Sequence, residues 1–247
     1  MKDGKGGRRT FLKETAAAAT AFAALTATPV GILAEEKSSM ARKDILVNHE
    51  WGKLKEVVVG VPNVRLPSKL AEAPKRFLSE ASIDFIEKNA GKRLEDCAAE
   101  LNSKFVEQVN GIIKILKDRG VVVHQVKKLL PSEEAFLSEQ NDTVMQTFPR
   151  DPMLVIGNHF IETAMFEPNR RRERFAIRRT VGDRLAASNA CVVSMPEPEP
   201  FPADKDGKYG PGPFLEGGDV LLVGRDIYVG NTGNASNAAG IRWLQNM

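Results

Sequence analysis

Cysteine is scarce in this 247-residue sequence, and charge is balanced once the first residues are set aside. Cys97 and Cys191 are the only two cysteines, so at most one disulfide can form. From residue 35 onward, basic and acidic side chains number 30 each, which gives no electrostatic reason to expect nucleic acid or an anionic membrane as a partner. A hydrophobic fraction of 42% still suffices to bury a substantial core. We therefore expect a globular protein that acts on a small molecule.

The N-terminus carries a targeting pattern. Arg8-Arg9 precedes Phe11-Leu12-Lys13, and an Ala/Thr-rich apolar stretch covers residues 16–27, as is typical of a twin-arginine export signal. This stretch is shorter than the roughly 20 apolar residues that a membrane-spanning helix needs. A basic amphipathic tail is the alternative. We predict a signal peptide over residues 1–34, export to the periplasm or the medium, and one partial domain over residues 35–247.

The body alternates strand and helix patterns, which predicts an α/β fold. Residues 54–61 and 121–126 have the apolar character of buried strands, and His124 in the second is expected to pack in a sheet. Between them, apolar residues from Leu94 to Leu116 recur at three- and four-residue steps and predict a long helix that Gly120 ends. Cys97 falls in the helical pattern and Cys191 opens a later apolar strand, so both are expected to be small core residues rather than nucleophiles.

The second half of the sequence contains an internal repeat. Two strand pairs turn at Gly157-Asn158 and at Gly224-Arg225-Asp226, with their glycines 67 residues apart. A helix pattern follows each pair, over residues 170–187 and again from about Ser236, and residues 191–195 add a strand to the first unit. Such a module cannot bury both faces alone. Because the chain ends inside the second helix, we expect a truncated array of modules.

An acidic motif precedes each strand pair at an equivalent place. Asp151 belongs to the first motif, and Glu216 and Asp219 flank two glycines in the second. A carboxylate beside glycines that let the backbone approach closely is suited to binding a planar cation such as guanidinium through two parallel hydrogen bonds. The alternative is that these acids cap turns and pair with Arg150, Arg225 or lysines on the surface.

Four segments, in order, resemble the guanidino-group-modifying family of amidinotransferases and arginine deiminases. That family has a pentein-like α/β-propeller fold of five modules, and the resemblance implies that about three of them are present here. Around the first acidic motif, this sequence is most similar to the glycine amidinotransferases. The segments are Asn48 to Val57, Phe148 to Pro152 with Gly157 to Met165, Arg170 to Phe175, and Gly224 to Tyr228 with Asn237 to Leu244.

The resemblance implies roles for five residues. Asp151 would bind the substrate guanidinium, Glu216 would orient the catalytic histidine, and Arg170 would hold a substrate carboxylate. Phe148 would flank the guanidinium plane, and Asp219 would join the substrate site. The nucleophilic cysteine and the acid–base histidine come from later modules in this family, and the resemblance assigns neither role to the residues Cys97, Cys191, His49, His124 and His159.

The implied chemistry is thiolate attack on a guanidinium carbon, with release of an amine and transfer of the amidino group from a covalent intermediate. Glu216-Gly-Gly-Asp219 is closer to the deiminase form of the motif. The short segment between Leu130 and Phe148, and Asn234 where deiminases use an arginine, favour a transferase. A deiminase and a non-catalytic binder of arginine-like ligands stay open. The expected partner is a guanidino compound such as arginine, with no metal or cofactor, and the oligomeric state is open.

Overall fold

The computed structural model describes residues 44–198, 212–233 and 235–247 of the chain. They belong to one compact unit from Arg42 to Met247. The predicted signal peptide and Asn234 lie outside the described residues. Among the helices of the described part, none is both long enough and apolar enough to cross a membrane.

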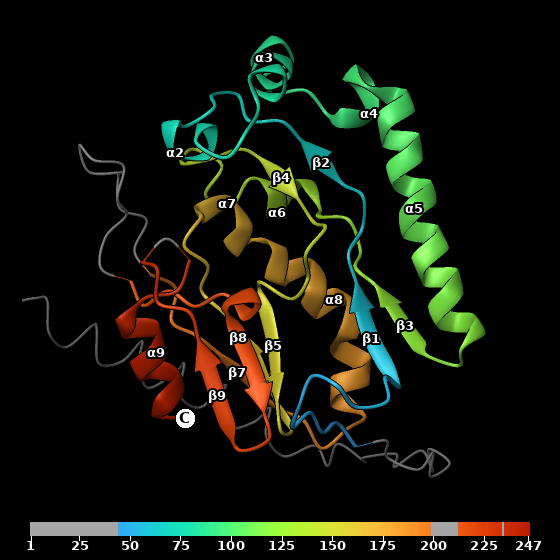
Figure 1. The fold of residues 1–247 in the computed structure, drawn as a ribbon, viewed down its shortest axis with the longest axis vertical. Coiled ribbons are helices and arrows are strands. Elements are labelled where there is room, and N and C mark those ends of the chain that lie inside the picture. Colours follow the sequence, from blue (N-terminus) through green and yellow to red (C-terminus); the bar gives the residue numbers. More distant parts are fainter. Residues whose placement is uncertain (1–43, 199–211, 234) are drawn as a thin grey trace, which may run out of the picture. The chain divides into compact units, whose positions relative to one another are not determined.

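A parallel strand pair and a long helix form the first part of this unit. Strands β1 (Glu56–Val59) and β3 (Val122–Gln125) pair from Glu56↔Val122 to Val59↔Gln125, and α5 (Ala99–Asp118) packs beside β3 (Figure 1). The helix predicted from Leu94 is interrupted. Ala98 has φ −150° and ψ 60°, which leaves the helical region, so a separate α4 (Leu94–Cys97) precedes α5.

Short elements connect β1 to the rest of the unit. Strand β2 (Val64–Arg65) pairs antiparallel with β4 (Val144–Met145). Three short helices complete this part: α2 (Glu72–Lys75), α3 (Glu80–Lys88) and α6 (Pro131–Glu134).

The two predicted hairpins are confirmed. Strands β5 (Met153–Ile156) and β6 (His159–Glu162) are antiparallel, and β7 (Cys191–Ser194) adds parallel to β6. Strands β8 (Val220–Val223) and β9 (Asp226–Val229) form the second hairpin. The turn glycines have φ values of +58° for Gly157 and +63° for Gly224, a left-handed conformation that favours glycine.

Helices follow both hairpins, as the repeat predicts. The first lies within residues 168–186 and is divided at Arg172 into α7 (Pro168–Arg171) and α8 (Glu173–Ala186). The second is α9 (Ala238–Gln245), whose N-cap Asn237 accepts a hydrogen bond from the Gly240 amide. The described residues therefore have an α/β fold with a repeated hairpin–helix unit.

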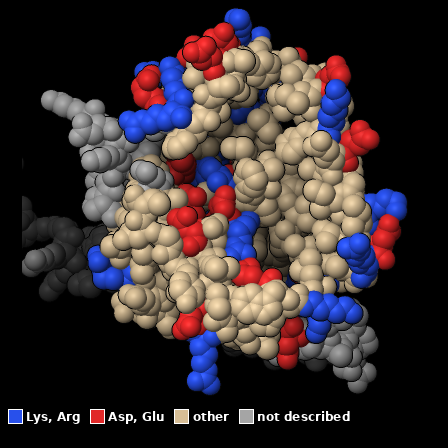
Figure 2. Space-filling view, in the orientation of Figure 1, with Lys and Arg blue, Asp and Glu red and all other residues tan. Residues whose placement is uncertain are grey.

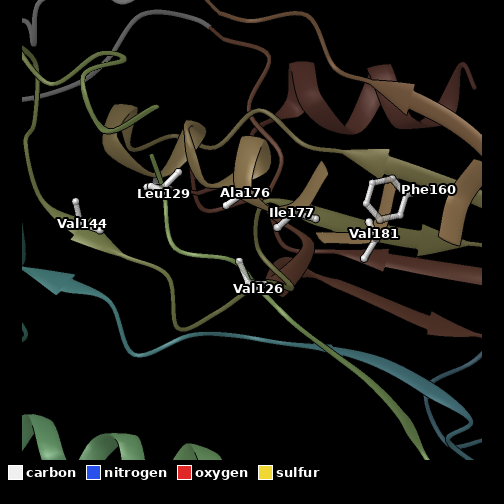
Figure 3. Close-up of a cluster of buried hydrophobic side chains, with 7 residues drawn as sticks. All are labelled: Val126, Leu129, Val144, Phe160, Ala176, Ile177 and Val181. Atoms are coloured by element: carbon white, nitrogen blue, oxygen red, sulfur yellow. The ribbon is translucent and has the colours of Figure 1, made fainter. Parts of the chain in front are cut away.

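Apolar residues of α8 pack against the strands to form one core cluster. Figure 3 shows Ala176, Ile177 and Val181 of α8 beside Phe160 of β6 and Val126, which follows β3. A second cluster joins the two hairpins through Leu154, Ile161, Val220 and Leu222, together with Leu215 and other residues. Burial of these side chains fixes the ends of β5, β6 and β8 relative to one another, which is where the acidic motifs lie.

The core placement predicted for the two cysteines is wrong. Cys97 is half-buried and belongs to neither core cluster, Cys191 is exposed, and both are free thiols. Cys191 opens β7, an edge strand of the β5–β6–β7 sheet, so its apolar sequence context does not place it in the core. His124 lies in β3, where its Nε2 is 2.7 Å from a Glu56 carboxylate oxygen. The prediction that it packs in a sheet is confirmed.

Candidate active site

The two acidic motifs meet in the folded chain. The Gly217 amide donates to the Asp151 carbonyl at 2.9 Å, and the Thr163 hydroxyl donates to the same oxygen at 2.7 Å. A Cβ atom at Gly218 would collide with Oδ1 of Asp151. Glycine is therefore required at position 218 if the Asp151 carboxylate is to lie against the second motif.

The second motif is fixed by the segment that leads into α9. Residues Gly217–Asp219 form a single 3₁₀ turn. The Ser236 amide donates to Oδ2 of Asp219, and the Glu216 amide donates to the Ser236 hydroxyl, both at 3.0 Å. Ser236 thereby fixes the Glu216 backbone and the Asp219 carboxylate relative to each other.

Arg170 is the cation of this cluster. Its Nη1 donates to Asp151 Oδ2 at 2.8 Å, while Nε and Nη2 donate to the two Glu173 carboxylate oxygens at 2.8 and 3.2 Å. Nη2 also lies 3.4 Å from the Phe148 carbonyl oxygen. Burial lowers the pKa of Arg170, but the two carboxylates outweigh it and the pKa is raised. Arg170 is therefore charged at any working pH.

Two carboxyl groups of the cluster have pKa values raised to near neutral pH. Burial raises the pKa of Glu173 to about 7; Arg170 opposes this rise, and the charges of Asp151 and Glu216 add to it. Burial likewise raises the pKa of Glu216 to about 7, opposed by Arg170 and strengthened by Asp151 and Asp219. One guanidinium thus faces several carboxylates, and their mutual repulsion favours a further cation in the same place.

The three consecutive arginines at the end of α7 point into different surroundings. Arg171 donates to the carbonyls of Met165 and Phe166 and pairs with Glu197. Arg172 donates to the carbonyls of Glu134 and Thr143. Arg170, by contrast, contacts Asp151 of the first acidic motif.

Arg150, a candidate surface partner for the acids, has a different role. It pairs with both carboxylate oxygens of Glu50 at 3.0 and 2.8 Å, and it donates to the carbonyls of Gly217 and Val220. The Arg150 hydrogen bond lowers the pKa of Glu50 despite partial burial. Arg150 thereby ties the segment before β5 to the segment around the start of β8, while the hydrogen bond to the Asp151 carboxylate comes from Arg170.

Four of the five predicted site residues lie together. Asp151, Arg170, Glu216 and Asp219 are connected by the contacts and charge interactions above. The Phe148 side chain is 52% exposed, and its carbonyl, rather than its ring, contacts Arg170. Sequence reasoning assigned no role to Glu173, although its position three residues after Arg170 was a signal for a helical ion pair.

Figure 2 shows that the face with α7 and the start of α8 is hollowed near its middle, and acidic and basic side chains gather there. In the described segments, no group of three or more His, Cys, Asp or Glu side chains is placed to hold a metal ion.

Comparison with known proteins finds relatives of the sequence among curated proteins. The chain is 26% identical over 221 residues to the mitochondrial glycine amidinotransferase of Xenopus laevis, and 28% identical over 221 residues to that of Gallus gallus. The chain resembles the amidinotransferases. Each match covers 80% of this chain and 50% of the relative, so the chain spans about half the length of these curated relatives. No family model matches the sequence.

Solved amidinotransferase structures share the fold. SxtG, an amidinotransferase of the saxitoxin biosynthetic pathway from Microseira wollei, superposes with a TM-score of 0.61 at 24% identity and covers 82% of this chain and 61% of SxtG. The inosamine-phosphate amidinotransferase of Streptomyces griseus gives a TM-score of 0.62 at 23% identity, with coverage of 83% and 60%. The predicted resemblance to this group of enzymes is confirmed.

Proposed function

We propose that this chain supplies the guanidinium-binding part of an amidinotransferase active site, within a pentein-like propeller of hairpin–helix modules. The observation that carries the proposal is that Asp151 meets the Glu216–Asp219 motif beside the half-buried guanidinium of Arg170. A cluster that already accommodates one guanidinium and still has excess negative charge is chemically suited to bind a second one from a substrate.

The proposed reaction transfers an amidino group in two steps. A cysteine thiolate attacks the guanidinium carbon of the donor, a C–S bond forms, and the C–N bond to the departing amine breaks as that amine takes a proton. An acceptor amine then attacks the same carbon, loses a proton, and displaces the thiolate. Asp151 would hold the guanidinium charge through both steps, and Glu216 would orient the histidine that moves the protons.

The two cysteines of the chain are not placed to be this nucleophile. Cys191 pairs with His159, the first residue of β6. Asp151 lies at the other end of this strand, where its carbonyl accepts a hydrogen bond from Thr163. Cys97 lies in α4, which packs against β2 and α5. We therefore expect the thiolate and the histidine from other segments of a longer polypeptide or from a partner chain.

A hydrolase is the second candidate, because Glu216-Gly-Gly-Asp219 resembles the deiminase form of the motif. Both reactions would begin with thiolate attack on the guanidinium carbon held by Asp151. In the transferase the alkylamine leaves and an acceptor amine takes the amidino group from the sulfur. In the deiminase ammonia leaves, the alkyl chain stays on the carbon, and water displaces the thiolate. Product analysis separates them. A longer gene product incubated with arginine and glycine would give ornithine and guanidinoacetate if it is a transferase, and citrulline if it is a deiminase.

Binding to the chain itself is the direct test of the proposal. Isothermal titration with agmatine and arginine should show a single site, and Asp151→Asn should remove most of the affinity because one acceptor and the charge are lost. Glu133→Gln is a matched control, since Glu133 forms a bidentate pair with Arg179 outside the cluster. Binding that is equal in Asp151→Asn and in the unaltered chain would exclude Asp151 as the guanidinium ligand.

A further inference from the structure

We propose that Glu173 is a positioning residue that acts on Asp151 through Arg170. Glu173 contacts Arg170, and Arg170 contacts Asp151. We call this chain of contacts the relay, and it sets where the Asp151 carboxylate lies before a substrate arrives. The inference rests on the proposed function, because it assigns to Glu173 a part in presenting the group that binds the substrate guanidinium.

The orientation of the Arg170 guanidinium carries the first step. Glu173 accepts from Nε at 2.8 Å and from Nη2 at 3.2 Å, which occupies one edge of the planar group. A two-point contact of this kind fixes both the position and the plane of a guanidinium. The remaining terminal nitrogen, Nη1, is then directed at Asp151 Oδ2 at 2.8 Å.

The orientation of the Asp151 carboxylate carries the second step. Arg170 contacts Oδ2, while Oδ1 lies against Gly218 of the second motif. Glu216 also interacts with the charge of Arg170, so it is a competing partner for a guanidinium that has lost its anchor. Glu173 therefore keeps Arg170 on Asp151 and away from Glu216.

Burial separates the role of Glu173 from that of a substrate ligand. Its side chain is 4% exposed, against 19% for Asp151 and 13% for Arg170. Glu173 is the first residue of α8, where a negative charge is also favoured by the helix N-terminus. A carboxylate this enclosed reaches a ligand only through Arg170, so it is a positioning residue rather than a catalytic one.

Charge around Glu173 makes the relay sensitive to pH near neutrality. The groups that act on it are Arg170 at the end of α7, Asp151 before β5 and Glu216 before β8, and its own charge acts on Arg172. Protonation of Glu173 removes the charge that anchors Arg170. Its carboxyl pKa of about 7 places this change in the range where affinity can be measured.

The test compares Glu173→Gln with the Glu133→Gln control in the full chain. Agmatine affinity, measured by titration at pH 6, 7 and 8.5, should fall about tenfold at pH 8.5 in Glu173→Gln, within the range of coupling between neighbouring residues. The gain in affinity from pH 6 to pH 8.5 should shrink in the same variant and persist in the control. An unchanged affinity and pH profile in Glu173→Gln would overturn the relay.

A double-mutant cycle guards against a general loss of structure. In an Arg170→Gln background, adding Glu173→Gln should produce no further loss of agmatine affinity, because the intermediate of the relay is already gone. If the fold-losses of agmatine affinity in the two single variants multiply in the double variant, Glu173 does not act through Arg170. This comparison does not depend on the single Glu173 variant being as stable as the unaltered chain.

A ligand-free measurement separates this inference from the proposed function. The Arg170 Nε–H resonance, assigned by its disappearance in Arg170→Lys, should exchange slowly with water in the unaltered chain and rapidly in Glu173→Gln. Slow exchange in both would overturn the relay even if guanidino ligands bind. Absence of agmatine binding together with the expected change in exchange would contradict the proposed function and leave the Glu173–Arg170 anchor supported.

Discussion

Two charged clusters of this protein differ in the ratio of cations to carboxylates. In the Glu134 cluster, Arg65 and Arg93 both donate to Glu134 at 2.8 Å. Asn63 accepts from Arg93, and its amide donates to Gln146 at 2.6 Å. In the Asp151 cluster, a single guanidinium serves Asp151 and Glu173 and acts on Glu216.

The difference indicates which cluster is structural. The Glu134 cluster ties β2, β4, α4 and α6 together with complementary donors and acceptors, as a scaffold requires. The Asp151 cluster has an excess of carboxylates and two carboxyl pKa values raised to about 7. Such an arrangement is unfavourable in an empty site and becomes favourable when a cation binds, which is typical of a functional site.

The largest expected effect is chemical and confined to the Asp151 cluster. In a protein that carries this chain together with the nucleophile, Asp151→Asn should slow formation of the covalent amidino adduct by about 10² to 10³, as for loss of one preorganised electrostatic contact. Mass spectrometry of the protein after mixing with arginine measures the adduct. Glu134→Gln should form it at an unchanged rate, and adduct formation that survives Asp151→Asn would remove the contrast between the clusters.

The next effect is on stability and belongs to the Glu134 cluster. Glu134→Gln leaves Arg65 and Arg93 facing each other without a carboxylate, and the free energy of unfolding should fall by about 2–3 kcal/mol. This is less than for a fully buried pair, because both arginines are partly exposed. Urea unfolding at pH 7 measures the change. A loss below about 0.5 kcal/mol would show that the arginines are sufficiently solvated without Glu134.

A smaller effect of opposite sign is expected at Glu216. Its pKa is near 4.5 in the unfolded chain and about 7 in the folded protein, so between these values the folded state binds more protons and stability falls as pH rises. Glu216→Gln should therefore raise the free energy of unfolding at pH 8 by about 1–2 kcal/mol, a value discounted for partial solvation. The gain should vanish by pH 4. If Glu216→Gln is no more stable than the unaltered chain at pH 8, the ionised Glu216 carboxylate does not destabilise the folded state.

The local pattern of the sequence predicted the hairpins and both helices that follow them, and the family resemblance placed the two acidic motifs in one site. It did not predict which partner each charged residue selects. Arg170, Arg171 and Arg172 are consecutive, so helix geometry turns their side chains about 100° apart, and the partner of each depends on which segments of the fold lie on that side. The exposure of Cys191 likewise depends on β7 being an edge strand, which is a property of the sheet. Long-range contacts decided each of these outcomes.

The smallest expected effect tests the role of Arg170 itself. The family resemblance assigns this residue to a substrate carboxylate, which would make Arg170→Lys weaken arginine far more than agmatine, a ligand without a carboxylate. In the structure, Asp151 and Glu173 occupy both edges of the Arg170 guanidinium. We therefore expect Arg170→Lys to weaken both ligands through Asp151, with their affinity ratio changed less than about twofold. Titration of the two ligands against the same variant measures the ratio. A selective loss of affinity for the ligand arginine would mean that Arg170 breaks its contact with Asp151 or Glu173 when substrate binds. The relay through Asp151 would then hold only in the ligand-free state.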